Sequence, residues 1–287
     1  MKKQVIIHAL HTAEDNSPIK SMKQVSGGSI NESYYVETAE ERYFIKYHTN
    51  PPARFFEIET SGLELIRQTD TISVPDVYAY SDEKNNAFLV MEWVEGNRKL
   101  DTEEKLGSRI SAMHQHTGEK HGYEEDTFIG TLPQPNGLFT NWVEYYRDQR
   151  LTAQLNQGIN QERITGIRRQ RLEDLLDKLD KFVPANPEPS YLHGDFWGGN
   201  WLVGENGAPY IIDPSFLYGD RHFELAFTEL FGGYSEDFYH AYNEKYAMAD
   251  YYDDVKPLYQ LYYLLVHLNI FGESYGSRVD AVLRKFT

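Results

Sequence analysis

The chain reads Leu192-His193-Gly194-Asp195-Phe196-Trp197-Gly198-Gly199-Asn200 and, after a short interval, Tyr210-Ile211-Ile212-Asp213-Pro214. An Asp, an Asn five positions later and a second Asp at the end of the next apolar segment form a pattern typical of phosphoryl transfer. Asp195 can accept the proton of a hydroxyl group, and the side-chain oxygens of Asn200 and Asp213 can hold Mg²⁺ against the phosphates of a nucleotide. The pattern predicts a kinase of small molecules, with Asp195 as the base and Asn200 and Asp213 as metal ligands.

Each of these residues also has a plainer interpretation. A lone Asp after His-Gly is more often a turn or cap residue, and an Asp followed by Pro214 commonly ends a strand. The combined spacing favours catalysis over both alternatives. Gly198 and Gly199 allow the backbone to pass close to phosphates or to turn tightly. His193 is expected to brace the loop backbone by hydrogen bonding.

Lys46 lies inside an apolar strand, where an ammonium group is unfavourable unless a partner is supplied. The following helix offers Glu57 and Glu59. Glu59 is the preferred partner because Leu63, four residues further on, belongs to the apolar face of that helix, and Glu57 remains the alternative. In kinases such a Lys–Glu pair holds the α- and β-phosphates. A solvated edge lysine is the plainer interpretation.

Two further segments are expected to contact the nucleotide. A Gly-Gly pair lies about two strands before the lysine, where its amides could cap phosphates, although most such pairs are hairpin turns. The last strand of the same sheet ends in a segment whose backbone could meet adenine, and this segment is also a plausible core strand. A P-loop is not supported, because the GxxxxGK[ST] pattern is missing. The predicted contacts are Gly27, Gly28 and Ser29 in the first segment and Met91, Glu92, Trp93 and Val94 in the second.

The hydrophobic patterns predict an α+β chain with two lobes. Residues 1–50 are expected to be rich in β-structure, and residues 1–94 to form a small antiparallel sheet with one helix. Residues 95–287 are expected to form a large, mainly helical lobe. The N-terminal elements are strands at 33–38, 42–47, 73–80 and 87–94 and a helix at 55–68. The C-terminal helices are expected at 103–116, 139–156, 162–182, 224–231, 236–246 and 254–271.

Composition restricts the class of partner. The 287 residues carry a net charge of −16, which disfavours nucleic acid and anionic membrane surfaces. The chain has no Cys, so disulfides and thiolate chemistry are excluded. Neither a signal peptide nor an apolar run of about 20 residues is evident, and the expected location is the cytoplasm. A monomer is the default expectation.

The motifs resemble a known family. HGDxxxxN followed by IDP, together with Lys46 and Glu59, looks like the aminoglycoside/choline-kinase branch of the protein-kinase-like fold. More narrowly, the chain from about residue 20 to 270 resembles the fructosamine (ketosamine) 3-kinase family. The segments that carry this resemblance are 25–34, 56–63, 129–136, Trp142, Arg150-Leu151 and 192–200.

The resemblance implies a bilobal kinase fold and ATP-dependent phosphorylation, with Mg²⁺, of a ketosamine at its third hydroxyl group. The acceptor would be a glycated amine or a glycated lysine of a protein, and the unstable product would lead to deglycation. Asp195, Asn200, Asp213, Lys46 and Glu59 would keep the roles given above, and Gly27, Gly28 and Ser29 would cover the nucleotide. Trp197 is a candidate for stacking on the sugar. Gln134 and Asn136 belong to the family pattern without an evident role, and a structured loop is their plainer interpretation.

Two alternatives stay open. The chain could phosphorylate another hydroxyl acceptor, such as an aminoglycoside, a choline-like amine or a sugar, or it could be an inactive nucleotide-binding pseudokinase. The sequence departs from the family and from protein kinases at two points. Ser29 stands where some family members have Cys, so redox control through that loop cannot apply. Pro214 stands where protein kinases have Gly, which stiffens the segment after Asp213.

Overall fold

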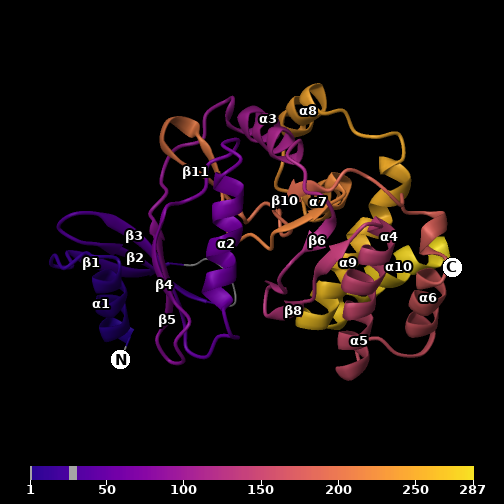
Figure 1. Ribbon diagram of the computed structural model, residues 1–287, viewed down its shortest axis with the longest axis horizontal. Coiled ribbons are helices and arrows are strands. Elements are labelled where there is room, and N and C mark those ends of the chain that lie inside the picture. The colour runs from indigo at the N-terminus through magenta and orange to yellow at the C-terminus, as the bar shows by residue number, and fades with distance from the viewer. Residues whose placement is uncertain (1, 26–30) are drawn as a thin grey trace. The chain divides into compact units, whose positions relative to one another are not determined.

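The computed structural model of the chain describes residues 2–25 and 31–287 (Figure 1). It divides into two compact units. The first comprises Met1–Leu106 and Asn200–Pro214, and the second comprises Gly107–Gly199 and Ser215–Thr287. These units differ in extent from the predicted lobes, residues 1–94 and 95–287, and the division into those lobes stays a prediction. The predicted mixture of antiparallel sheet and helices is confirmed.

An antiparallel sheet forms the centre of the first unit, with strands in the order β1-β2-β3-β5-β4. The four predicted strands are present, although β4 begins four residues later than expected. The strands are β1 (Ser21–Val25), β2 (Glu32–Glu37), β3 (Arg42–His48), β4 (Val77–Ser81) and β5 (Ala87–Glu92). Lys46 of β3 lies opposite Ser33 on one side and Leu89 on the other, in an interior strand of the sheet. The predicted phosphate loop at Gly27, Gly28 and Ser29 lies outside the described residues.

The β-rich prediction is wrong for the start of the chain, where Lys2–Thr12 form helix α1 (Figure 1). The run Val5-Ile6-Ile7 has the composition of a strand. The buried residues of α1 are nevertheless spaced for one helical face, at Val5, Ile6, Ala9 and Leu10. They join one hydrophobic core with alternate residues of β3, including Ile45. Burial of one face of this segment against the sheet therefore explains why it forms a helix and not a strand.

Helix α2 (Phe55–Arg67) covers the opposite face of this sheet (Figure 1). Successive strand residues point to opposite faces, so Lys46 and His48 face away from the α1 core that contains Ile45. The ring of His48 accordingly contacts Phe55, with centroids 5.6 Å apart. Lys46 and the first turns of α2 thus share one face of the sheet.

The carboxylate of Asp82 anchors the start of α2. It accepts hydrogen bonds from the backbone N–H groups of Phe56 and Glu57, at 2.8 and 3.1 Å. These first-turn amides have no partner within the helix, so an acceptor from outside stabilises this end. Because the first turn is held in this way, Glu59 occupies a defined position one turn further along.

The second unit contains short strands that the sequence analysis did not predict. A sheet in the order β10-β13-β6-β9 and a separate β7–β8 hairpin interrupt a region expected to be helical or irregular. Each strand is only three residues long, so alternation between apolar and polar residues cannot be recognised. The strands are β6 (His121–Tyr123), β7 (Thr127–Ile129), β8 (Leu132–Gln134), β9 (Gly137–Phe139), β10 (Ser190–Leu192) and β13 (Leu217–Gly219).

The helices follow the prediction with three differences. The expected helix at 139–156 is divided by a π-helical segment, Tyr146–Thr152, and the one at 162–182 is shorter. A C-terminal helix was missed. Helix α3 begins in the first unit and ends in the second. The helices are α3 (Thr102–His114), α4 (Trp142–Tyr145), α5 (Ala153–Asn160), α6 (Gly166–Leu176), α7 (Arg221–Leu230), α8 (Glu236–Lys245), α9 (Tyr252–Phe271) and α10 (Gly276–Phe286).

Aromatic side chains build much of the core of the second unit. The rings of Phe227 on α7 and Tyr263 on α9 stack with centroids 3.6 Å apart. Phe223 stacks on the same Tyr263 at 5.0 Å. These contacts bind α7 to α9 through large apolar surfaces. Within residues 2–25 and 31–287, none of the helices has both the length and the apolar character needed to cross a membrane.

Candidate active site

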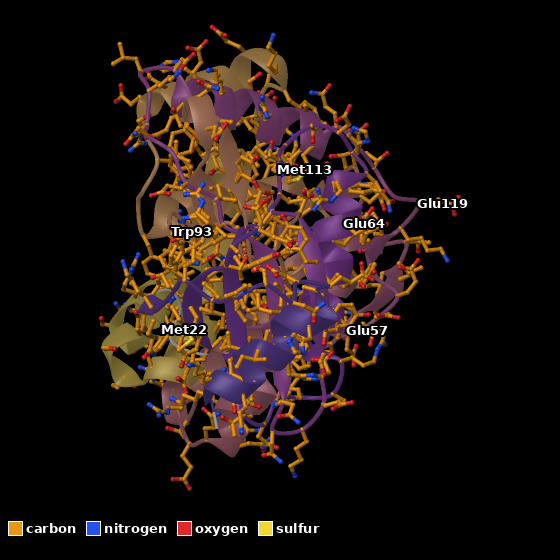
Figure 2. The ribbon with its side chains drawn as sticks, turned by 90° about the vertical axis from the view of Figure 1, so that its left-hand side faces the viewer. Met22, Glu57, Glu64, Trp93, Met113 and Glu119 are labelled. Carbon is orange, nitrogen blue, oxygen red and sulfur yellow. The ribbon has the colours of Figure 1, made fainter. Side chains whose placement is uncertain are left out.

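In the first unit Lys46 holds two carboxylates together. Its side chain is 5% exposed, and its Nζ lies 2.6 Å from Glu59 Oε1 and 2.5 Å from Asp213 Oδ1. The ion pair predicted between Lys46 and Glu59 is present. The alternative partner, Glu57, instead pairs with Arg54 at 2.9 Å and keeps 37% of its side chain exposed. Figure 2 shows Glu57 among the side chains that project from α2.

The buried ammonium group of Lys46 therefore faces two carboxylates, one nearly buried on Glu59 and one partly exposed on Asp213. Burial lowers the pKa of Lys46, but the charges of Asp213 and Glu59 more than offset it, so the pKa is raised overall. Burial raises the pKa of Glu59 to about 7, against the opposing effect of Lys46 and with a further increase from Asp213. The two shifts are compatible, because the one positive charge of Lys46 is shared between Glu59, whose side chain is 11% exposed, and Asp213, whose side chain is 37% exposed. Lys46 stays protonated, and Glu59 takes up a proton at a higher pH than an ordinary glutamate does.

Asn200 and Asp213 lie at the same end of a hairpin in the first unit. Strand β11 (Trp201–Val203) pairs with β12 (Pro209–Ile211), and the N–H of Ile212 donates to the carbonyl of Asn200 at 3.0 Å. The backbone of Asp213 adopts a left-handed conformation, with φ of 59°. Such a conformation is unfavourable for a residue other than Gly and is frequent at functional sites.

The donors at this end of the hairpin fit Mg²⁺. Asn200 and Asp213 both offer hard oxygen atoms, which this ion prefers. Among the described residues no group of three or more His, Cys, Asp or Glu side chains could enclose a metal. A site with one carboxylate and one amide suits an ion that takes its remaining ligands from nucleotide phosphates and water.

The predicted adenine-binding segment ends strand β5. Met91 is buried, and the backbone N–H groups of Glu92 and Trp93 donate to the carbonyls of Asp76 and Arg42, at 2.8 and 3.3 Å. These two amides already donate hydrogen bonds within the protein. An adenine contact on this segment would therefore use carbonyl groups or Val94.

In the second unit Asp195 lies on a loop whose backbone is held from two sides. The carboxylate of Glu224 accepts from the N–H groups of His193 and Gly194, at 3.2 and 2.6 Å. The hydroxyl of Tyr263 donates to the Gly194 carbonyl at 3.2 Å. The N–H of Asp195 donates to Nδ1 of His193 at 3.2 Å, so the predicted bracing role of His193 is confirmed.

Gly194 cannot carry a side chain in this arrangement. Its φ is +84°, and a Cβ atom would lie 1.9 Å from the carbonyl oxygen of Ser215. Both facts require glycine at this position. The residue before Asp195 is thereby fixed in its conformation.

Glu224 is the residue that sequence reasoning missed. It is fully buried on α7, and its Oε1 lies 2.9 Å from Nε2 of His114, whose Nδ1 lies 2.8 Å from the hydroxyl of Tyr242. Burial lowers the pKa of His114, which indicates a neutral ring that donates from Nε2 to Glu224 and accepts from Tyr242. An acidic residue in a predicted helix gives no sign of such burial, so only the structure identifies Glu224 as a positioning residue.

Trp197 follows Asp195 in the same loop and keeps 42% of its surface exposed. Its ring lies against Gly199, where a Cβ atom would come within 2.3 Å of the indole. Part of the indole is therefore exposed to solvent. The ring occupies space that a side chain at position 199 would fill. This arrangement is compatible with the predicted stacking on a sugar, which stays a prediction.

Gln134 and Asn136 are engaged with the protein itself. The amide of Gln134 donates to Thr127, and its oxygen accepts from Tyr262 at 2.7 Å. The oxygen of Asn136 accepts from Tyr145 and Arg150, at 2.7 and 2.9 Å, and its amide nitrogen donates to Glu125 and Thr127. These bonds favour the structured-loop interpretation over contact with a substrate.

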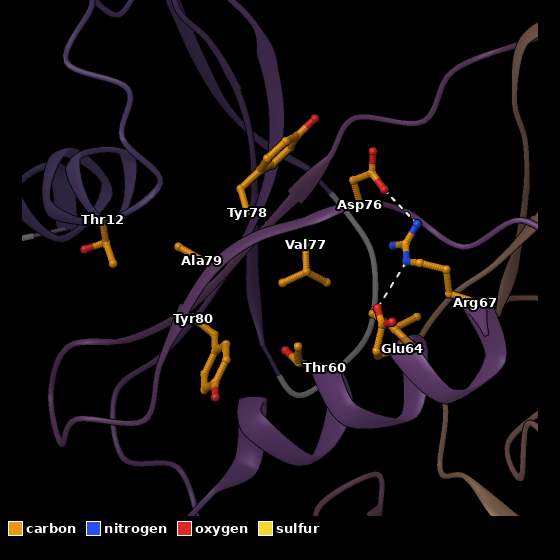
Figure 3. Close-up of a pocket in the computed structure, with 10 residues that line it drawn as sticks. Thr12, Thr60, Glu64, Arg67, Asp76, Val77, Tyr78, Ala79 and Tyr80 are labelled. Atoms are coloured by element: carbon orange, nitrogen blue, oxygen red, sulfur yellow. Dashed lines mark hydrogen bonds and ion pairs between the residues drawn. The ribbon is translucent and has the colours of Figure 1, made fainter.

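A separate pocket of about 620 Å³ lies between α2 and β4 of the first unit (Figure 3). The guanidinium of Arg67 crosses it and pairs with Asp76 at 2.7 Å and with Glu64 at 3.4 Å. None of the predicted site residues lines this pocket. It therefore plays no part in the candidate active site.

Comparison with known proteins gives a consistent result. The fructosamine kinase family model matches residues 1–287. The probable ketoamine kinase of Enterococcus faecium is 35% identical over 263 residues, which cover 91% of this chain and 94% of that protein. The solved structure of a candidate fructosamine-3-kinase from Haemophilus somnus matches with a TM-score of 0.86 and 28% identity, covering 99% of this chain and 95% of the other. Aminoglycoside phosphotransferase APH(4)-Ia matches with a TM-score of 0.64 at 15% identity over 100% of both chains, which confirms the predicted protein-kinase-like fold.

The raised pKa of Glu59 predicts a pH effect on stability. Between the ordinary glutamate pKa of 4.5 and about 7, the folded chain holds a proton on Glu59 that the unfolded chain has lost. The contribution of Glu59 is therefore fully present below this range and is lost as the pH rises through it. Urea unfolding across the range should show the free energy of unfolding of the wild type falling relative to that of Glu59→Gln.

Glu57→Gln is the matched control on the same helix. The hydrogen bond from Arg54 lowers the pKa of Glu57, so this residue loses its stabilising effect only at lower pH. If the free energy of unfolding changed with pH in the same way for the wild type and Glu59→Gln, this would contradict a buried Glu59 that binds a proton.

Proposed function

The chain belongs to the fructosamine kinase family, and we propose that it phosphorylates the 3-hydroxyl group of ketosamines, the sugar adducts of amines and of protein lysines. Membership makes the chain an ATP-dependent phosphotransferase with an alcohol group as acceptor, and it implies a glycated amine as substrate. The observation that carries the proposal is the buried ammonium of Lys46 between Glu59 and Asp213. One ammonium group with two carboxylates carries an excess of negative charge, which suits a nucleotide phosphate that brings a divalent cation with it.

In this proposal the first unit binds the nucleotide. Lys46 contacts the α- and β-phosphates and keeps Glu59 as its partner, while Gly27, Gly28 and Ser29 cover the phosphates. Asn200 and Asp213 hold Mg²⁺, which when bound neutralises charge that develops on the transferred phosphoryl group. Asp213, which contacts Lys46 in the free protein, would be a ligand of the metal, and Lys46 would keep its ion pair with Glu59.

Asp195 acts as the base toward the acceptor. Asn200 follows five positions further along the chain, so the two Cα atoms are at most about 18 Å apart. The bonds from Glu224 and Tyr263 to the preceding backbone hold its loop in one conformation. A base fixed in this way aligns the acceptor hydroxyl group without further ordering, which is the main source of rate in phosphoryl transfer.

The chemistry of the product suggests the biological role. A ketosamine carries a carbonyl group next to the third carbon, and a phosphate ester at that carbon is a good leaving group. We expect the phosphorylated adduct to decompose and to release the amine. The activity would then repair glycated amines, including lysine side chains.

An acceptor screen tests the proposal most simply. ADP release should be observed with fructosyl-lysine or ribulosyl-lysine in the presence of MgATP, and phosphorus NMR should locate the phosphate on the third carbon. Choline, an aminoglycoside and free fructose serve as competing acceptors. Turnover of one of these in preference to both ketosamines would contradict the proposal. ATP binding without turnover of any acceptor would instead support an inactive pseudokinase.

Substitution of Asp195 by Ala should abolish turnover and leave ATP binding largely intact. Removal of a positioned base reduces rates by about 10²–10⁴-fold, whereas the proposed nucleotide ligands lie on other residues. A coupled ADP assay and a nucleotide titration measure the two effects. Asp237→Ala, at an exposed position of α8, is the control and should behave as the wild type. Retained turnover in Asp195→Ala would remove Asp195 from its proposed role.

A further inference from the structure

The hydroxyl group of Tyr234 is buried and has no hydrogen-bond partner among the described residues. Buried hydroxyl groups are usually paired, because an unpaired one forfeits its bonds to water, at about 1–3 kcal/mol. Tyr234 belongs to the segment between α7 and α8. Neither the proposed nucleotide site nor the predicted catalytic residues use it.

The ring of Tyr234 lies beside the loop that carries Asp195. Its centroid is 5.3 Å from that of Phe196, which directly follows Asp195, and 4.7 Å from that of Phe238. Burial raises the pKa of Tyr234 well above its usual value, with further increases from the negative charges of Glu224 and Asp195. The phenol therefore keeps its proton and can donate it in a hydrogen bond.

Close backbone packing fixes this position. A Cβ atom on Gly198 would lie 3.0 Å from Cα of Gly233, and a Cβ atom on Gly233 would lie 2.9 Å from Cα of Gly198. Gly232 and Gly233 have φ of +74° and +105°, which glycine adopts readily. The segment before Tyr234 is thus held against the loop that follows Asp195. A donor with no partner among the described residues is thus held against Phe196, in the loop that carries the proposed base.

We propose that the hydroxyl group of Tyr234 donates a hydrogen bond to a sugar oxygen of the ketosamine and so helps to determine acceptor specificity. This inference rests on the proposed function. A ketosamine offers hydroxyl and carbonyl oxygens next to the hydroxyl group that Asp195 would align. Its binding would supply an acceptor that none of the described residues provides for Tyr234.

Removal of the Tyr234 hydroxyl group should affect the stability of the free protein and its activity in different ways. Tyr234→Phe removes an unpaired buried hydroxyl group, so the melting temperature of the free protein should be equal to or higher than that of the wild type. The same change removes one hydrogen bond to the acceptor, so kcat/KM for the ketosamine should fall about 2- to 10-fold. KM for ATP should not change.

Tyr239→Phe is the matched control. The hydroxyl group of Tyr239 already bonds to Thr228 Oγ1 at 3.0 Å, and it has no place in the proposed site. Its removal should leave kcat/KM for the ketosamine unchanged. The three proteins are compared by steady-state kinetics with fructosyl-lysine and ATP varied in turn, and by thermal unfolding without substrates.

An active wild type with the same kcat/KM as Tyr234→Phe would overturn the inference and leave the proposed function intact. Equal losses of kcat/KM in both variants, accompanied by a lower melting temperature of Tyr234→Phe, would also overturn it, because they would indicate a structural effect. A wild type that does not phosphorylate fructosyl-lysine or any other ketosamine would contradict the proposed function, and the inference would fall with it.

Discussion

The arrangement of the first unit depends on how the positive charge of Lys46 is compensated by carboxylates. An interior strand places this charge on the α2 face of the sheet, where only strong partners make it tolerable. Glu59 reaches it from α2 and Asp213 from the end of the β11–β12 hairpin, so three segments far apart in sequence meet at one nitrogen atom. The second carboxylate, that of the partly exposed Asp213, leaves a surplus of negative charge around Lys46. That surplus is what a divalent cation and its nucleotide would relieve, and it links the architecture of this unit to phosphoryl transfer.

In the second unit, the main constraint is on the backbone of the loop that carries Asp195. It does not arise from a cluster of opposite charges like the one at Lys46. Glu224 is buried on α7, bonded to His114, and engages two consecutive amides ahead of Asp195. Glycine at position 194 is required by the carbonyl of Ser215, and the contact between Gly198 and Gly233 fixes the loop on its other side. The loop that carries the proposed base, Asp195, is thus held by groups that have no part in the proposed reaction. Preorganisation of this kind is the general source of rate when the chemistry itself needs little assistance.

The sequence correctly predicted features that depend on neighbouring residues or on the chemistry of individual side chains. The alternation in 33–47 predicted β2 and β3, and the position of Leu63 on the apolar face of α2 correctly favoured Glu59 over Glu57. It failed where burial was decided by distant residues. The strand-like run at the start of α1 is helical because the sheet core accepts one helical face, and the buried state of Glu224 depends on His114, 110 positions away. The side chains of Gln134 and Asn136, which the sequence left without a role, bond to their own loop and to Tyr262, Tyr145 and Arg150. The roles of Asp195, Asn200 and Asp213 in catalysis stay predictions.

The central claim is that Lys46, Asn200 and Asp213 form the phosphate and metal site. A crystal structure of the protein with Mg²⁺ and a non-hydrolysable ATP analogue tests it most directly. We expect Lys46 Nζ in contact with phosphate oxygens and still paired with Glu59, and Mg²⁺ bound by the oxygens of Asn200 and Asp213. A nucleotide bound elsewhere, or a metal ion held without Asp213 while Lys46 and Asp213 remain paired, would contradict the account.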